Sequence, residues 1–158
     1  MTTVPLKSLE LHLADEGATL GLGEAIAQGA AAPVLIFLEG DLGAGKTTLS
    51  RGLLRGLGHT GSVKSPTYTI VEPYLIPGCP VYHFDLYRLG DPEELEYLGL
   101  RDYLEEQAVV LIEWPERGAA WLPEPDLLVQ LRPDEEGRVA TLMARSERGL
   151  SVLAHLRL

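Results

Sequence analysis

The sequence predicts a three-layer α/β fold in which a mixed central sheet, with parallel core strands and antiparallel hairpins, carries helices on both faces. Two apolar runs, residues 34–38 and 108–112, have the composition of strands that are covered on both sides. Helical patterns flank the first run, so strands and helices alternate along the chain. Because 158 residues are the size of one ordinary domain and no repeat or long linker divides them, we expect a single domain over residues 1–158.

The first half of the chain is expected to arrange its elements around the strand at residues 34–38, the centre of the predicted sheet. Residues 7–12 have the pattern of an edge strand. Residues 16–30 form an imperfect amphipathic helix, which Gly21 and Gly23 weaken because glycine has a low helix propensity.

A second helix follows the glycine-rich segment after this strand. It carries a leucine at every fourth position, Leu49, Leu53 and Leu57, and this apolar stripe is expected to face the sheet. Gly52 and Gly56 lie within the helix, although a glycine there costs about 1 kcal/mol in helix propensity. We therefore expect these two glycines to allow a close approach of the helix to the sheet.

Two hairpins are expected in the second half. Residues 60–80 contain four prolines, which favour a loop, and residues 68–75 then pair with residues 81–85. Residues 126–131 and 138–144, on either side of an acidic turn, form the final hairpin. Both hairpins are antiparallel, so they widen a sheet whose core strands are parallel.

The helix between the hairpins begins with a strong signal. Asp91 is a typical cap, Pro92 suits the first helical position, and two glutamates lie near the positive end of the helix dipole. We expect Gly99 to end or bend this helix. The buried strand at residues 108–112 then leads to Glu113, an acid at the end of the sheet where open α/β folds bind ligands.

The segment after the first buried strand has every fixed position of the Walker A phosphate-binding motif. It reads Gly40-Asp41-Leu42-Gly43-Ala44-Gly45-Lys46-Thr47, followed by Thr48. Its glycines allow backbone amides to turn toward phosphate oxygens, Lys46 bridges the β- and γ-phosphates, and the Thr47 hydroxyl binds magnesium. Because the motif lies between a strand and a helix, it predicts a P-loop NTPase fold that binds a nucleoside triphosphate.

Magnesium also requires a carboxylate from a neighbouring strand end, and the sequence offers two. Glu113 follows the better strand, and Asp85 follows residues 81–84. We expect Glu113 in the metal shell, whereas Asp85 binds the metal or orients the attacking water.

Other residues near these motifs are weaker candidates. Thr67 lies in a polar loop at the place where P-loop enzymes sense the γ-phosphate, and we include it among the catalytic candidates. His83, inside a strand, is more typical of a core histidine than of a base. Trp114 directly follows Glu113, and its position alone does not distinguish a nucleotide contact from packing.

The charge of the chain limits its partners. A net charge of -10 repels nucleic acid, so direct RNA binding is disfavoured. No run of residues is apolar for long enough to span a membrane, and we expect a cytoplasmic protein. The chain contains no asparagine, so it lacks the Asn-Lys-x-Asp guanine reader of small GTPases, and adenine is favoured.

The motifs together resemble those of the TsaE (YjeE) family. The resemblance rests on four segments: residues 40–48, residues 65–69 (Ser-Pro-Thr-Tyr-Thr), residues 83–88 (His-Phe-Asp-Leu-Tyr-Arg) and residues 113–115 (Glu-Trp-Pro). It covers nearly the whole chain, and the joint occurrence of the segments is highly specific. Members of this family are bacterial P-loop ATPases required for the N6-threonylcarbamoyl modification of adenosine 37 in tRNAs that read ANN codons.

The resemblance implies an activity and partners. ATP would be hydrolysed slowly to ADP, with Mg²⁺ held by Thr47 and Glu113 and with residues 65–69 as a first switch. Trp114 would lie beside the nucleotide, and Glu16, Thr19 and Arg138 near its adenine end. The protein would join a TsaB–TsaD heterodimer and reset it between turnovers, contacting tRNA only indirectly through that complex and not transferring the group itself.

Two other classes share part of this pattern. A small-molecule P-loop kinase has the same loop and strand-end acids, but it also needs an arginine-bearing lid and an acceptor pocket, neither of which is evident in the sequence. A nucleotide-dependent binding module would bind ATP and change shape without significant turnover.

Overall fold

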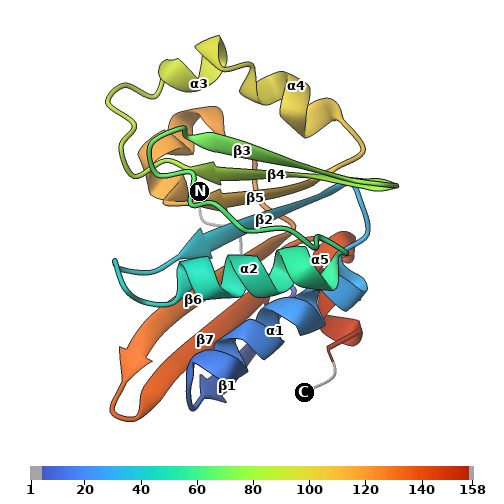
Figure 1. Ribbon diagram of the computed structural model, residues 1–158, viewed down its shortest axis with the longest axis vertical. Coiled ribbons are helices and arrows are strands. Elements are labelled where there is room, and N and C mark those ends of the chain that lie inside the picture. The colour runs from blue at the N-terminus through green and yellow to red at the C-terminus, as the bar shows by residue number, and fades with distance from the viewer. Residues whose placement is uncertain (1–4, 157–158) are drawn as a thin grey trace.

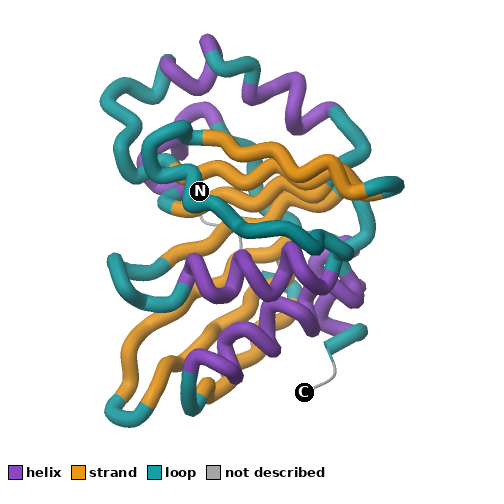
Figure 2. The backbone as a smooth tube through the Cα atoms, in the orientation of Figure 1, coloured by secondary structure: helices purple, strands orange, loops and turns teal. Residues whose placement is uncertain are grey.

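The computed structural model describes residues 5–156, which form one seven-stranded sheet with helices on both faces (Figures 1 and 2). The strands are β1 (Lys7–Leu13), β2 (Val34–Glu39), β3 (Val71–Ile76), β4 (Cys79–Asp85), β5 (Val109–Glu113), β6 (Leu127–Asp134) and β7 (Gly137–Ala144). Their order across the sheet is β1-β7-β6-β2-β5-β4-β3. The predicted single domain includes residues 1–4 and 157–158, which lie outside the described residues.

The predicted P-loop-type α/β fold is confirmed by the strand directions. Neighbours among β4, β5, β2 and β6 are parallel. The pairs β3–β4, β6–β7 and β1–β7 are antiparallel, so both predicted hairpins and the predicted edge strand are present. The parallel strands thus occupy the core of the sheet and the antiparallel ones its flanks.

Each face of the sheet packs against its own group of helices. Helices α1 (Glu16–Gly29), α2 (Lys46–Gly56) and α5 (Glu147–Ala154) share one hydrophobic core with the sheet. Helices α3 (Glu94–Tyr97) and α4 (Leu100–Glu105) contribute Leu95 and Leu100 to a second core on the opposite face. Strand β2 alternates between the two, with Ile36 in the first and Leu35 in the second. This explains why its sequence has no polar face.

The glycines of α2 serve a different contact from the one predicted. A Cβ atom on Gly52 would lie 2.2 Å from the carbonyl oxygen of Leu20, and one on Gly56 would lie 2.6 Å from Cβ of Ala27. Both neighbours belong to α1, so the expectation of a close approach to the sheet was wrong. Gly23 of α1 has the reciprocal role, since its Cβ would lie 2.3 Å from the carbonyl oxygen of Leu49. The two helices therefore touch backbone to backbone, side by side as in Figure 1.

Several elements of the second half differ in extent from the predictions: β4 and β6 are longer than expected, and β3 and the helix after Asp91 differ for identifiable reasons. Strand β3 begins at Val71 instead of residue 68, because residues 66–70 form a turn in which the Ile70 amide donates to the Pro66 carbonyl at 2.7 Å. The helix predicted after Asp91 consists of the two short helices α3 and α4, separated by Gly99 in a left-handed conformation. The predicted start was wrong, because α3 begins at Glu94 with Glu93 at its N-cap position, while the Asp91 side chain accepts from the Glu93 amide at 2.9 Å. Gly99 thus interrupts the helix as expected.

Two helical elements have no counterpart among the predictions. Residues Pro115–Trp121 form a 3₁₀ helix, η1, directly after β5. Helix α5 follows β7, and its N-cap Ser146 accepts a hydrogen bond from the Gly149 amide while donating to Asp126 at 2.7 Å. A serine cap followed by Glu147 was the available sequence signal for α5.

The glycine contact between α1 and α2 generates a stability prediction. Gly52→Ala should destabilise the fold by about 1–3 kcal/mol, the usual effect of overpacking, even though alanine is the better helix former. Gly21→Ala is the matched control, because a Cβ there meets no atom within 4 Å. It should instead stabilise by about 0.5–1 kcal/mol. Urea unfolding measures both, and a wild-type stability for Gly52→Ala would contradict the close contact.

Candidate phosphate-binding site

The Walker A residues form the loop between the end of β2 and the start of α2. Gly43 (φ 82°) and Gly45 (φ 106°) adopt left-handed conformations that residues with a Cβ atom rarely take. Gly45 is the N-cap of α2 and offers no side chain to its first turn. The first N–H groups of α2 therefore lack partners within the helix and lie at its positive end, which is favourable for an anion.

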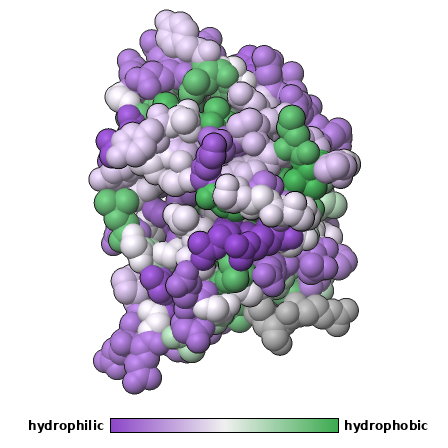
Figure 3. Space-filling model, in the orientation of Figure 1, coloured by the Kyte–Doolittle hydropathy of each residue, from purple (hydrophilic) through white to green (hydrophobic). Residues whose placement is uncertain are grey.

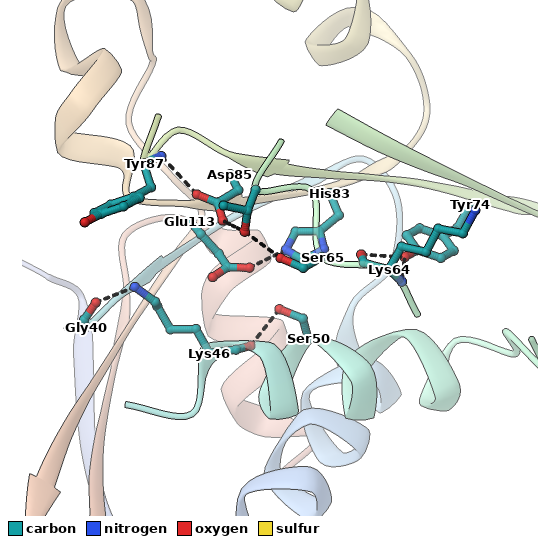
Figure 4. A network of polar contacts seen from close by, with 11 residues as sticks. Gly40, Lys46, Ser50, Lys64, Ser65, Tyr74, His83, Asp85, Tyr87 and Glu113 are labelled. Atoms are coloured by element: carbon teal, nitrogen blue, oxygen red, sulfur yellow. Dashed lines mark hydrogen bonds and ion pairs between the residues drawn. The ribbon is translucent and has the colours of Figure 1, made fainter. Parts of the chain in front are cut away.

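Two carboxylates meet this loop because their strands end together. In the parallel register of β4 and β5, Asp85 pairs with Glu113, and Glu113 pairs with Leu38 of β2. Both acidic side chains are buried. Figure 4 shows Glu113 between Lys46 below it and His83 and Asp85 above it.

Loop, helix and strand ends together line a cleft of about 270 Å³. The predicted site residues in its lining are Leu42, Gly43, Gly45, Lys46, Thr47, Thr48, Thr67, Asp85, Glu113, Trp114 and Arg138. Ser65 and Tyr87 line it as well. Tyr87 was not among the predicted site residues, although it belongs to the segment at residues 83–88 that carries the family resemblance.

Four predicted nucleotide-binding residues lie outside this lining. Asp41 and Ala44 belong to the loop, where the Ala44 amide donates to the Asp41 carbonyl at 3.0 Å. Glu16 is exposed at the start of α1 and pairs with Arg51 of α2 at 3.0 Å, whereas Thr19 is buried within α1. Contacts of these residues with a nucleotide stay predictions.

Lys46 is held at the cleft in a nearly buried position. Its Nζ donates to the Gly40 carbonyl and lies 3.8 Å from the centre of the Trp114 ring. Burial lowers the pKa of Lys46, while the negative charges of Glu113 and Asp85 act in the opposite direction. Because little water competes there, attraction to a phosphate oxygen is stronger than at an exposed site.

The side chain of Asp85 is fixed by two hydrogen bonds. Oδ1 accepts from the Tyr87 amide at 2.9 Å, and Oδ2 accepts from the Thr67 hydroxyl at 3.1 Å. Thr67 Oγ1 lies in turn 2.6 Å from Ser65 Oγ. The polar loop is thereby linked directly to the acid at the end of β4.

Glu113 has a different partner. Its Oε2 lies 2.6 Å from Nε2 of His83, and both side chains are buried. Since a carboxylate only accepts, the imidazole donates. His83 does not line the cleft, so it contacts the site through Glu113.

Arg138, at the start of β7, reaches across to the phosphate loop. Its Nε donates to the Ala44 carbonyl, and Nη2 donates to the Gly43 carbonyl at 2.9 Å. These bonds hold the carbonyl groups of Gly43 and Ala44 in place. A contact of Arg138 with adenine stays a prediction.

A second and larger cleft, of about 510 Å³, lies between α3–α4 and η1. Its lining includes Leu100, Leu104, Trp121 and Leu122, and shares no residue with the phosphate cleft. The larger cleft also has the charged residues Glu96, Arg101 and Asp102 in its lining, but the Walker A loop and the two strand-end acids lie at the smaller one.

Comparison with known proteins matches this architecture to one family. Residues 13–140 match the family model described as "Threonylcarbamoyl adenosine biosynthesis protein TsaE". The chain belongs to the TsaE family. A TsaE protein from Haemophilus influenzae is 46% identical over 154 residues, 94% of this chain and 98% of the relative. The TsaE protein from Bacillus subtilis is 43% identical over 115 residues, 72% of each chain.

A solved structure agrees with the sequence relatives of this TsaE chain. The crystal structure of YdiB from Bacillus subtilis superposes with a TM-score of 0.81 at 32% sequence identity, covering 94% of this chain and 93% of YdiB. The family resemblance and the fold predicted from the sequence are therefore both confirmed.

The surface of this TsaE chain is mixed. Figure 3 shows a largely hydrophilic face over α1 and α2, with apolar residues in scattered patches. Within residues 5–156, no helix is both long enough and apolar enough to span a membrane.

Trp114 provides a direct test of the cleft. Removal of the second tryptophan by Trp121→Phe leaves Trp114 as the only indole. Saturation with ADP or ATP should then change the emission of Trp114, because phosphate draws the Lys46 ammonium from its position over the ring. The control is Trp114→Phe, whose remaining Trp121 lies in the other cleft and should not respond. A flat Trp114 titration at concentrations where calorimetry shows saturation would contradict this placement.

Proposed function

We propose that this chain is an ATP-binding and slowly ATP-hydrolysing subunit of the cytoplasmic machinery that makes N6-threonylcarbamoyladenosine in tRNA. The observation that carries the proposal is the convergence of Lys46, Asp85 and Glu113 from three elements on one cleft at the N-terminus of α2. Membership of the TsaE family supplies the biosynthetic context.

In this proposal, groups within the cleft bind the phosphates although the net charge of the chain repels them. The chain carries a net charge of -10, yet the cleft offers helix N–H groups and the ammonium of Lys46. Within reach of these groups the local field attracts an anion, although the distant field repels it. Adenine is the favoured base, because the chain lacks the asparagine of the familiar guanine reader.

The donor set of the cleft fits Mg²⁺. Thr47, Glu113 and Asp85 all offer oxygen atoms, the ligand type that Mg²⁺ prefers. Among residues 5–156, no group of three or more His, Cys, Asp or Glu side chains is placed to hold a metal ion by itself. One or two carboxylates plus nucleotide phosphates are a common arrangement for Mg²⁺, which neutralises charge on the phosphates when it is bound.

The remaining groups position the reacting water and the loop. Asp85 either completes the metal shell or orients the attacking water, and its bond with Thr67 couples this role to the polar loop. Phosphoryl transfer requires mainly positioning and charge stabilisation, so few proton-transferring groups are needed. If a partner protein supplies part of the catalytic site, the chain alone would hydrolyse ATP slowly.

The partner in this proposal is a TsaB–TsaD heterodimer. An acidic protein acts poorly on tRNA directly, because the phosphate backbone repels it. Contact with tRNA through the complex removes this difficulty. The chain would supply the energy-coupled step, while its partners transfer the threonylcarbamoyl group.

Lys46→Ala and Glu113→Ala should separate nucleotide binding from hydrolysis. Lys46→Ala should weaken ATP binding by roughly 10- to 100-fold, since a hydrogen bond to a charged group contributes about 1.5–3 kcal/mol. Glu113→Ala should lower magnesium-dependent hydrolysis by about tenfold or more while changing binding less. Calorimetry and phosphate release measure the two effects. Glu105→Ala, which removes an exposed acid outside the cleft lining, is the control, and unchanged turnover in Glu113→Ala would remove Glu113 from the metal shell.

Association with the partners distinguishes the proposal from its alternatives. Mixed with TsaB and TsaD from the same source, the chain should form a complex and release phosphate faster than alone. A small-molecule kinase would need an added acceptor molecule, and TsaB and TsaD would not change its rate. A binding module would associate with these proteins but would release no phosphate. Lys46→Ala should remove the stimulated phosphate release. Absence of association at micromolar concentrations would refute the proposal.

A further inference from the structure

His83 and Glu113 form a buried polar pair behind the phosphate cleft. The side chains are 1% and 5% exposed, and their Nε2 and Oε2 atoms are 2.6 Å apart. Figure 4 shows the imidazole on the side of Glu113 opposite to Lys46. A contact of this length between buried groups fixes both side chains strongly.

The register of the sheet produces this pair. His83 lies two residues before Asp85 on β4, so both side chains project from the same face of the strand. On the neighbouring strand, Glu113 pairs with Asp85, and His83 pairs with Leu111. The imidazole therefore lies one step deeper in the sheet than the two acids and reaches the Glu113 carboxylate diagonally from behind.

A purely structural role explains this histidine poorly. Its second nitrogen, Nδ1, is buried and has no hydrogen-bond partner among the described residues. Most buried polar atoms in proteins are paired, because an unpaired one destabilises the fold. The neighbouring inward position, Val81, is a buried aliphatic residue of the kind that a structural role at position 83 would favour.

The geometry favours an indirect role for His83 over a direct catalytic one. His83 is absent from the lining of the cleft, and Glu113 lies between its imidazole and Lys46. The contact that links the imidazole to the cleft is therefore the one with the Glu113 carboxylate. Its effect on the site must act through the position of Glu113.

We propose that His83 is a positioning residue that holds Oε2 of Glu113 and so presents Oε1 to the magnesium site. This inference rests on the proposed function, in which Glu113 is a ligand of Mg²⁺ bound with ATP. His83 contacts one of the two carboxylate oxygens, and no described residue donates a hydrogen bond to the other. Hydrogen-bonding partners behind metal ligands orient them, and their loss typically weakens metal affinity or activity by about 10- to 100-fold.

The test compares nucleotide binding with and without the metal. For the full chain, calorimetry measures the dissociation constant of ATP in EDTA and the dissociation constant of ATP with Mg²⁺. The first constant divided by the second gives the factor by which Mg²⁺ strengthens binding, and this factor is the ratio compared below. His83→Leu should reduce this ratio by about tenfold or more and leave the EDTA constant unchanged. His83→Gln should keep the ratio within about threefold of wild type, because its amide nitrogen takes the place of Nε2.

The control is Tyr82→Phe, which removes a 2.6 Å hydrogen bond to Glu106 from the adjacent residue of β4 on the opposite face of the sheet. Its ratio should equal that of wild type. If His83→Leu does not fold, His83→Asn decides the question, because its amide is too short to reach Glu113. Asparagine should then lose the metal contribution that glutamine keeps.

The outcomes separate this inference from the function on which it depends. A wild-type ratio near one, unchanged in Glu113→Ala, overturns the magnesium assignment and the positioning role with it. A clear wild-type ratio that falls in Glu113→Ala but persists in His83→Leu, or in His83→Asn, overturns the positioning role alone. Equal losses with Mg²⁺ and in EDTA would show general damage to the cleft and would also refute it.

Discussion

The parallel register of three strands determines the rest of this site. Leu38, Glu113 and Asp85 lie side by side at the ends of β2, β5 and β4. From this line the chain turns directly into the phosphate loop, which begins two residues after Leu38. A shift of one residue in either pairing would turn every side chain of that strand to the other face and separate the acids from Lys46. Burial on both faces of the sheet specifies the register, because each face has its own hydrophobic core.

The sequence predicted those features that depend on local chemistry. Sequence patterns predict the apolar runs of β2 and β5, the glycine-rich loop and the acids at the strand ends. Each of these features depends on only a few neighbouring residues. The contact of Gly52 and Gly56 was assigned to the wrong partner. Periodicity shows which side of a helix is buried, but it does not show whether a sheet or another helix lies there.

Contacts between distant segments were beyond sequence reasoning for a physical reason. The bond from Thr67 to Asp85 depends on the turn at residues 66–70, and the bond from His83 to Glu113 depends on the pairing of β4 with β5. Tyr87 lines the cleft and its amide donates to Asp85, a local turn that the motif at residues 83–88 does not by itself predict. Helix α5 has only eight residues, too few for a strong periodic signal. The roles of the site residues follow from chemistry and remain predictions, whereas their positions are now known.

Arg138 gives the phosphate loop a property that its glycines alone do not provide. Glycine-rich segments are flexible, and ordering one around a ligand consumes binding free energy. Here the guanidinium group of a distant strand already holds the carbonyls of Gly43 and Ala44. The loop is thereby preorganised, and much of its conformational entropy is lost when the protein folds and not when a phosphate arrives. Because the tether belongs to the β6–β7 hairpin, the proposed function makes the mechanical stiffness of that hairpin part of phosphate recognition.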